Sequence, residues 1–109
     1  MANTFKLKTK ANVGVTTVGI YTAPASTTTV VIGITLSNTS GSGVNVGVGI
    51  TRAGTTEDIK LLKNAPIPQG SSLEFMGGIK VVLETTDTLT VDSDTNNSVD
   101  AALTIMEIT

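Results

Sequence analysis

The chain has 109 residues and a formal net charge of −2, and it contains neither cysteine nor histidine. These absences exclude disulfides, thiolate chemistry, histidine-based zinc sites and every nucleophile pair that uses histidine or cysteine. The small net charge and the lack of a large basic block argue against nucleic acid as a partner, because nucleic-acid binders gather lysine and arginine on one surface.

Beta-branched residues dominate the composition, with twenty threonines, twelve valines and nine isoleucines. Such side chains are stiff about χ1, pack well on a pleated surface and are mediocre helix formers. The length fits one domain over residues 1–109, and its core will be modest because only three residues are aromatic. We therefore expect a single all-β domain whose thin interior favours contacts with neighbouring subunits.

The first expected strand is TFKLKTK, residues 4–10, in which apolar and cationic residues alternate. A period of two predicts a half-buried strand with Phe5 and Leu7 on the buried face and the lysines on the other. A row of lysines commonly protects a sheet edge from unwanted pairing. The alternative is a contact with an acidic partner surface or a second subunit, for which Phe5, Lys6 and Lys8 are candidates.

The next three expected strands cover residues 13–21, 29–37 and 44–51, and the polar stretches TAPASTTT and NTSGSG separate them. In the second of these strands, alternation places four side chains on the buried face, namely Val30, Ile32, Ile34 and Leu36. In the third strand, the same pattern places four side chains inward, namely Val44, Val46, Val48 and Ile50. These two strands carry the strongest alternation in the chain.

Two glycines, Gly47 and Gly49, fall on the outer face of the strand at residues 44–51. Glycine weakens a strand and often marks a place where another backbone comes close. A bare outer face would let a second subunit lie flat against it, so both glycines are candidates for a subunit contact. The alternative is a β-bulge, or simple tolerance of glycine on a solvent face.

The second half of the chain continues with short strands and turns, and AGTTED is expected to be a loop. We expect strands at residues 59–63, 71–76, 79–84, 88–91 and 98–108. Two prolines separated by one residue predict a bend over residues 64–70, because neither can donate to a ladder. The pair Gly77-Gly78 predicts a break. Inward positions are assigned to Leu73, Phe75, Leu89 and Val91.

The last strand has inward residues at every second position, namely Val99, Ala101, Leu103 and Ile105. The apolar residues Met106 and Ile108 fall on the opposite phase, which predicts a bulge before Met106. Glu74, Glu84 and Glu107 are assigned to outward positions.

Eight or nine short strands and no convincing helix predict an antiparallel β-sandwich, either jelly-roll-like or immunoglobulin-like, in preference to a small barrel. Strand order stays open, because the different sandwich connections share one local pattern. No window of the sequence approaches eighteen apolar residues, and the N-terminal segment alternates in polarity. We therefore expect neither a membrane span nor a signal peptide.

The acidic stretch DSDTNNSVD, residues 92–100, is the one candidate for metal binding. Its oxygen-bearing side chains occupy relative positions 1, 3, 5 and 9, in the order of an EF-hand loop: Asp92, Asp94, Asn96 and Asp100. An EF-hand is excluded, because its twelfth position needs a bidentate glutamate and here holds Leu103, with strand-like sequence on both sides.

A looser calcium or magnesium site in the same stretch remains the alternative, since loops of many shapes can present carboxylates to a hard cation. The favoured interpretation is a hairpin turn, because turns select Asp, Asn and Ser for backbone reasons. Asn97 can adopt the left-handed conformation that such a turn needs. We therefore expect no metal ion and no other cofactor.

Catalysis by paired carboxylates is the remaining route to an enzyme. Glycosidases use such pairs, but they also need a cleft and aromatic platforms for sugar rings. With three aromatic residues the chain offers little of either, so we expect no enzymatic activity. Binding of sugar without catalysis is disfavoured for the same reason.

Three stretches resemble small all-β virion proteins of tailed bacteriophages, cyanophages especially: IYTAPASTTTVVIGITLSN, PIPQGSSLEFMGGIKVVLETTDTLTV and SVDAALTIMEI. In that group a Tyr-Thr-x-Pro entry leads into a Thr/Val strand ending in Asn, and a Pro-x-Gly turn, a Lys-x-x-Leu strand and an Asp-bearing turn follow. The resemblance covers residues 20–108, and its motifs are turns and strand ends. It departs at TTD, residues 85–87, where Gly would precede Asp.

The resemblance implies a component of the virion, assembled in the cytoplasm of a bacterial host. A capsid decoration or cement subunit is the first expectation, with copies that bury strand edges against one another as a homotrimer or against the major capsid protein. A neck or tail attachment protein is the alternative within the virion. A sugar- or calcium-binding β-sandwich module is the alternative outside it.

Overall fold

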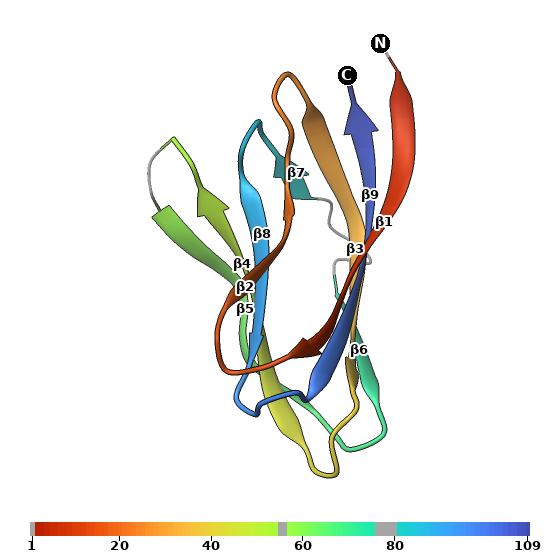
Figure 1. Ribbon diagram of the computed structural model, residues 1–109, viewed down its shortest axis with the longest axis vertical. Helices are drawn as coiled ribbons and strands as arrows, with labels where there is room; N and C mark the ends of the chain where they lie inside the picture. Colours follow the sequence, from red (N-terminus) through yellow and green to blue (C-terminus); the bar gives the residue numbers. More distant parts are fainter. Residues whose placement is uncertain (1, 55–56, 76–80) are drawn as a thin grey trace.

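The computed structural model describes residues 2–54, 57–75 and 81–109. Within them two antiparallel sheets pack face to face, and no helix occurs (Figure 1). The strands are β1 (Asn3–Val13), β2 (Val18–Thr22), β3 (Thr28–Asn38), β4 (Val44–Arg52), β5 (Glu57–Ile67), β6 (Ser72–Phe75), β7 (Val81–Leu83), β8 (Thr88–Ser93) and β9 (Val99–Ile108). The predicted all-β sandwich is confirmed. These described residues contain no helix able to cross a membrane.

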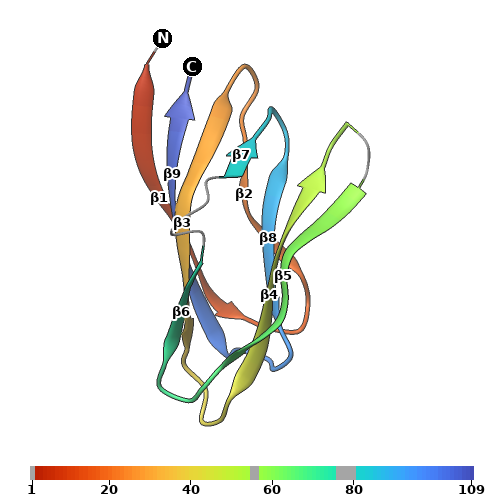
Figure 2. The same cartoon turned by 180° about the vertical axis from the view of Figure 1, so that it is seen from behind.

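The strand order identifies the sandwich as a jelly roll. One sheet has the order β1-β9-β3-β6, and the other has the order β2-β8-β4-β5. Most consecutive strands alternate between the two sheets, which is the connectivity of a jelly roll and differs from the immunoglobulin order. β6 and β7 both pair with β3 and lie along its free side one after the other (Figure 2).

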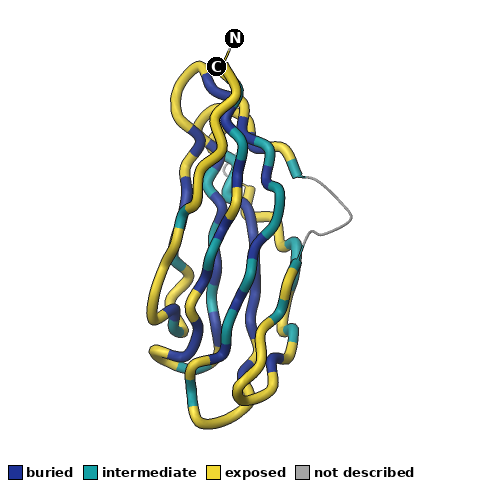
Figure 3. The backbone as a smooth tube through the Cα atoms, turned by 90° about the vertical axis from the view of Figure 1, so that its right-hand side faces the viewer, coloured by how far each residue is buried: buried dark blue, intermediate teal, exposed yellow. Residues whose placement is uncertain are grey.

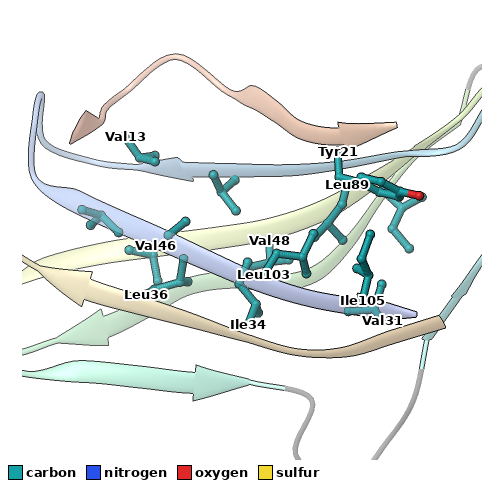
Figure 4. Close-up of a cluster of buried hydrophobic side chains, with 14 of the residues drawn as sticks. Val13, Tyr21, Val31, Ile34, Leu36, Val46, Val48, Leu89, Leu103 and Ile105 are labelled. Atoms are coloured by element: carbon teal, nitrogen blue, oxygen red, sulfur yellow. The ribbon is translucent and has the colours of Figure 1, made fainter. Parts of the chain in front are cut away.

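The core lies between the sheets and consists almost wholly of Val, Leu and Ile side chains (Figure 4). The inward positions predicted for β4, β8 and most of β9 are confirmed, since these side chains are at most 8% exposed: Val44, Val46, Val48, Ile50, Leu89, Val91, Val99, Ala101, Leu103 and Ile105. Leu73 and Phe75 of β6 are partly buried against this core.

The prediction for β3 is half right, because the strand contains a bulge. Ile34 and Leu36 are buried as expected, but Thr29 and Val31 are the buried residues in the first half of the strand. The pairing of β3 with β9 shifts by one residue between Val31 and Gly33, and an extra residue in a strand exchanges its two faces. Val30 and Ile32 are therefore only partly buried, and their predicted inward positions are wrong.

The bulge predicted in β9 before Met106 is wrong. Alternation continues unbroken to the end of the strand, so Met106 faces outward and Glu107 faces inward, where it is 6% exposed. The irregularity lies on the neighbouring strand β3 instead. The prediction failed because it assigned the apolar Met106 to the core, whereas the regular alternation of the strand places the carboxylate of Glu107 on the core side.

β5 is longer than predicted and contains Pro66, so the bend expected over residues 64–70 is confined to residues 68–70. β5 lies at the edge of its sheet, where the missing N–H of proline costs no ladder bond on the free side. The strand predicted at residues 13–21 is divided, because β1 extends to Val13 and β2 starts at Val18. The break predicted at Gly77-Gly78 lies outside the described residues.

Candidate functional site

The acidic stretch at residues 92–100 connects β8 in one sheet to β9 in the other. It is therefore a link between the two sheets, and the predicted hairpin is wrong. Asn97 adopts the left-handed conformation expected of it, with φ of 51°. Inside the turn the Ser93 and Ser98 hydroxyls bond to each other at 2.7 Å, and the Ser98 hydroxyl also donates to the Thr95 carbonyl at 2.6 Å.

The first two candidate metal ligands are engaged by separate parts of the fold. Asp92 Oδ2 accepts a hydrogen bond from the Thr17 hydroxyl at 3.0 Å and lies 3.8 Å from Lys60 Nζ. Asp94 Oδ1 accepts from the backbone N–H of Asn45 at 3.1 Å. Each carboxylate thus ties the turn to a different strand or loop.

The other two candidates hold the end of β1 and the loop that follows it. Asn96 Oδ1 accepts from the N–H of Val15 at 3.5 Å, and Asp100 Oδ1 accepts from the N–H of Asn12 at 3.0 Å. Asn12 itself has a left-handed φ of 57°, and the bond to Asp100 supports that conformation. Among the described residues, no three His, Cys, Asp or Glu side chains converge in a way that could hold a metal ion.

We expect calcium at millimolar concentration to leave the thermal unfolding temperature of the protein unchanged. The oxygens of Asp92, Asp94, Asn96 and Asp100 already accept hydrogen bonds from four different directions, so a cation would have to break those bonds before it could bind. Differential scanning calorimetry with and without calcium measures this. A rise in the unfolding temperature with calcium but not with equal ionic strength of sodium chloride would contradict it.

Gly47 and Gly49 alternate with the core-facing valines of β4 as predicted, but both are buried, because this chain itself covers the surface above them. A Cβ on Gly47 would lie 2.6 Å from Asp92 Oδ1, and one on Gly49 would lie 2.8 Å from the carbonyl oxygen of Ile59. The pairing of β4 with β5 shifts register on both sides of Val48, which brings the β5 carbonyls close. The expected bare face is therefore absent, and a subunit contact through these glycines stays a prediction.

We expect Gly49→Ala to lower the free energy of unfolding by about 1–2 kcal/mol, because its methyl group would meet a backbone oxygen that cannot move alone. Chemical denaturation measures the change. Gly41→Ala is the matched control, since nothing lies within 4 Å of a Cβ at that position. Equal stabilities of the two variants would contradict the close approach.

β1 directs toward the core the face that was predicted to be exposed. Phe5 and Leu7 were expected on the buried face, but they are 68% and 64% exposed. In the pairing of β1 with β9, Phe5 lies opposite Met106, which faces outward, while Lys6 lies opposite Ile105, which faces the core. The physical reason is that β1 is an edge strand, where long lysine side chains can leave the inner face for water.

One line of apolar side chains crosses the outer face of this sheet. Phe5 pairs with Met106, Met106 with Val30, and Val30 with Val82, so the line runs over β1, β9, β3 and β7. We call these four residues the outer apolar row. Phe5 is 68% and Val82 is 53% exposed, so the ends of the row are open to solvent. Figure 3 views the molecule from this side and shows partly buried and exposed positions along the strands.

The rest of the same face carries many small residues and contains two shallow depressions. One hollow of about 270 Å³ is lined in part by Thr9, Lys10 and Asp100. A second of about 300 Å³ is lined in part by Gly33 and Glu74. The two adjoin, since Thr35 and Ala102 line both. The outer face thus offers a shallow, continuous surface without an enclosed pocket at this place.

A buried polar cluster joins four strands at the end of the sandwich where the two termini meet (Figure 1). The Tyr21 hydroxyl donates to Glu107 Oε2 at 2.6 Å and lies 2.8 Å from Thr29 Oγ1. Lys6 Nζ lies 2.8 Å from Glu107 Oε1. The outward position predicted for Glu107 is wrong, and this cluster was not foreseen, although extending the alternation of β9 by one step would have placed Glu107 inside.

The environment keeps Tyr21 and Glu107 in fixed charge states. Burial, and then the hydrogen bond to Glu107, raise the pKa of Tyr21 to about 12. The Lys6 ammonium and the Tyr21 hydroxyl lower the pKa of Glu107 below its usual range, against the opposing effect of burial. Neither pKa lies near neutrality, where a general acid or base works best, so the cluster suits a structural role.

Comparisons with known proteins find similarity in fold only. No protein-family model matches the chain, and no curated protein matches its sequence. A chain from the disulfide-linked pili that form Bacillus endospore appendages is similar with a TM-score of 0.57 and 17% identity, over 99% of this chain and 87% of that one.

Two similar structures come from infectious bursal disease virus. A chain of the T13 particle matches with a TM-score of 0.59 and 15% identity over 96% of this chain, and a chain of the Gx strain matches with 0.55 and 12% over 95%. This chain spans only 30% and 32% of those two chains. At such identities the matches establish a shared jelly-roll architecture.

Proposed function

We propose that the protein is a structural subunit of a virus particle. The observation that carries the proposal is the match of its jelly roll, over 96% of the chain, to a segment of a chain from the T13 particle of infectious bursal disease virus. A second support is chemical. The described carboxylates of the acidic turn and of the Tyr21 cluster are bound into hydrogen bonds that hold strands together.

Within that class we propose a capsid decoration or cement subunit of a tailed bacteriophage, which contacts the major capsid protein and further copies of itself. The support is the resemblance of residues 20–108 to small phage virion proteins. A homotrimer is the proposed assembly, and the virion, formed in the cytoplasm of a bacterial host, is the proposed location. A neck or tail attachment role is the alternative on the same particle.

A subunit of a protein fibre is the second candidate, and one observation favours it. The match to the Bacillus endospore pilus chain covers 87% of that chain, whereas the virus chains are matched over about a third of their length. This chain has no cysteine, so the disulfide linkage named for those pili is not available to it. A fibre of this protein would be held together without disulfides.

Quantitative mass spectrometry of purified particles from the source of the sequence tests the proposal. We expect peptides of this chain at a fixed ratio to the major capsid protein, and the ratio separates a decoration subunit, present in hundreds of copies, from a neck or tail protein, present in few. Particles washed at high salt are the control for adhering protein. Absence from the particles, with fibres visible by negative-stain electron microscopy of the purified chain, would overturn the virion role and favour the fibre.

A further inference from the structure

The first part of β1 contributes little to the hydrophobic core. Residues 3–10, which we call the β1 arm, are exposed except for the partly buried Lys8, whereas Val13 further along the strand is fully buried. The arm lies at the edge of its sheet, where β9 is its neighbour (Figure 1). Segments with few buried apolar contacts open locally at a lower free energy than the core does. The arm is therefore held by backbone pairing more than by side-chain packing.

One side-chain bond ties the arm to the rest of the described chain. Lys6 Nζ lies 2.8 Å from Glu107 Oε1 on β9. The other bonds of the arm belong to the backbone ladder, which keeps one register along β9 from residue 3 to residue 10. When such a ladder opens, water replaces the lost partners, so each ladder bond contributes only modestly to closure.

The root of the arm, residues 12–15, is fixed much more firmly. It makes four hydrogen bonds with the acidic stretch at residues 92–100. They run from the N–H of Asn12 to Asp100 Oδ1 (3.0 Å), of Val15 to Asn96 Oδ1 (3.5 Å), of Ser98 to the Val13 carbonyl (3.0 Å) and of Ser93 to the Gly14 carbonyl (2.9 Å). The acidic stretch thus anchors the point at which β1 leaves its sheet.

An irregularity separates the arm from this root. The register of β1 on β9 shifts between Lys10 and Val13, and Asn12 between them has a left-handed φ of 57°. A bulge of this kind leaves residues unpaired and interrupts the ladder. An opening that starts at residue 3 therefore has a structural reason to stop at residues 11–12, before the four bonds of the root.

We propose that the β1 arm opens from β9 about a hinge at residues 11–12 while the rest of the sandwich stays folded, and that the Lys6–Glu107 ion pair holds the arm closed. The open state presents the unpaired N–H and C=O groups of β9 at a sheet edge. Such an edge accepts an extended segment as an additional strand. The closed arm therefore protects an edge that the open arm makes available.

The cost of opening is confined to one side of β9. Lys6 and Lys8 of the arm lie opposite Ile105 and Leu103, so opening uncovers the arm side of these two residues. Their other side stays paired with β3. The apolar side chain of Phe5 is already exposed in the closed state, so its exposure adds little to the cost.

The ion pair makes closure depend on pH. The ionisable groups that face Glu107 are Lys6 and Lys8 of β1 and Tyr21 of β2. Lys6 and then Tyr21 lower the pKa of Glu107 in the closed state, and both lysines leave when the arm opens, so the pKa is higher in the open state. The contribution of the pair to closure is therefore complete above the open-state pKa and is lost as the pH falls through the lower, closed-state pKa.

Amide hydrogen exchange of the full chain, followed residue by residue by NMR, tests the opening. We expect protection factors about 100-fold lower for the paired amides of the arm than for those of β4 and β8. Exchange in the arm should also respond less to low concentrations of urea, because local opening exposes less surface than global unfolding does. Within β9, the amides bonded to β1 should exchange faster than those bonded to β3. Equal protection and equal urea dependence of arm and core would overturn the proposal.

Lys6→Met tests the ion pair, because methionine keeps an unbranched apolar side chain and removes the charge. We expect a further fall of about 3–10-fold in the protection of the arm at pH 7, with β4 and β8 unchanged. Lys63→Met is the matched control, since Lys63 is an exposed lysine on β5, an edge strand of the other sheet. In acid that protonates Glu107 but leaves the core protected, wild type and Lys6→Met should converge.

Two results would overturn the role assigned to the ion pair. One is an equal effect of Lys6→Met and Lys63→Met on the arm, and the other is an effect of Lys6→Met that persists after Glu107 is protonated. Equal loss of protection in the arm and in β4 and β8 would show that the arm unfolds only with the whole domain. None of these results bears on the presence of the protein in virus particles, so this inference and the proposed function fail separately.

Discussion

Leu103→Ala is expected to lower the free energy of unfolding by about 3 kcal/mol. Leu103 is fully buried in the middle of β9, opposite Ile34 of β3, and its side chain lies among those of both sheets (Figure 4). Removing three carbon atoms there loses their transfer free energy and leaves a cavity, which two sheets pinned by their ladders cannot close. A domain of this size is stable by only about 5–15 kcal/mol, so the loss is a large fraction of the total.

Thermal or chemical denaturation of the variant measures this loss, and the unfolding temperature should fall by about 10–20 °C. Val15→Ala is the control, since a half-exposed valine in a loop should change stability by less than about 0.5 kcal/mol. A loss below 1 kcal/mol for Leu103→Ala would mean that the sheets are not packed on this residue.

Glu107→Gln is the second large effect, with an expected loss of about 2 kcal/mol at neutral pH. Glu107 accepts from Tyr21 through one oxygen and faces the Lys6 ammonium through the other. Glutamine keeps the shape, but it removes the negative charge and turns an N–H donor toward either Lys6 or Tyr21. Glutamine cannot then accept hydrogen bonds from both Lys6 and Tyr21. The cluster that joins β1, β2, β3 and β9 loses its charge-assisted hydrogen bonds.

The loss should depend on pH in a defined direction. Lys6 and then Tyr21 lower the pKa of Glu107 in the folded protein from its ordinary value of 4.5. The stabilisation by the ionised carboxylate is therefore complete above that ordinary value and disappears as the pH falls through the lower, folded pKa. Wild type and Glu107→Gln should differ at pH 7 and converge in strong acid.

Glu74→Gln is the control for this titration, because Glu74 is an exposed carboxylate on β6. Its stability profile should follow that of the wild type at every pH. A difference between wild type and Glu107→Gln that stays constant from pH 7 into strong acid would show that the carboxylate charge contributes nothing.

The structure of the acidic turn was only partly predictable from the sequence. The residue types were interpreted correctly as turn formers, and the left-handed Asn97 followed from its chemistry. The predicted hairpin was wrong, because a turn that returns within a sheet and a turn that crosses between sheets select the same side chains. Only the pairing of β8 with β4 and of β9 with β3 decides which of the two is formed.

The buried face of β1 was also not predictable from the sequence. Its alternation was evident in the sequence, but the choice of the buried face was wrong, because at a sheet edge either face can meet solvent. The register of β1 on β9 decides the face by placing Lys6 opposite Ile105 and Phe5 opposite Met106. The correct orientation exposes Phe5 on the outer face of the sheet.

By itself the sequence determined the all-β class, the approximate strands and the inward faces of β4 and β8, because side-chain branching and a period of two act between near neighbours along the chain. The tertiary structure alone decided the jelly-roll order, the bulge in β3 and the inward Glu107. It also decided which side of β1 meets solvent. These features depend on which distant strands pair and at what register, and a one-residue shift in that pairing moves every side chain beyond it to the opposite face.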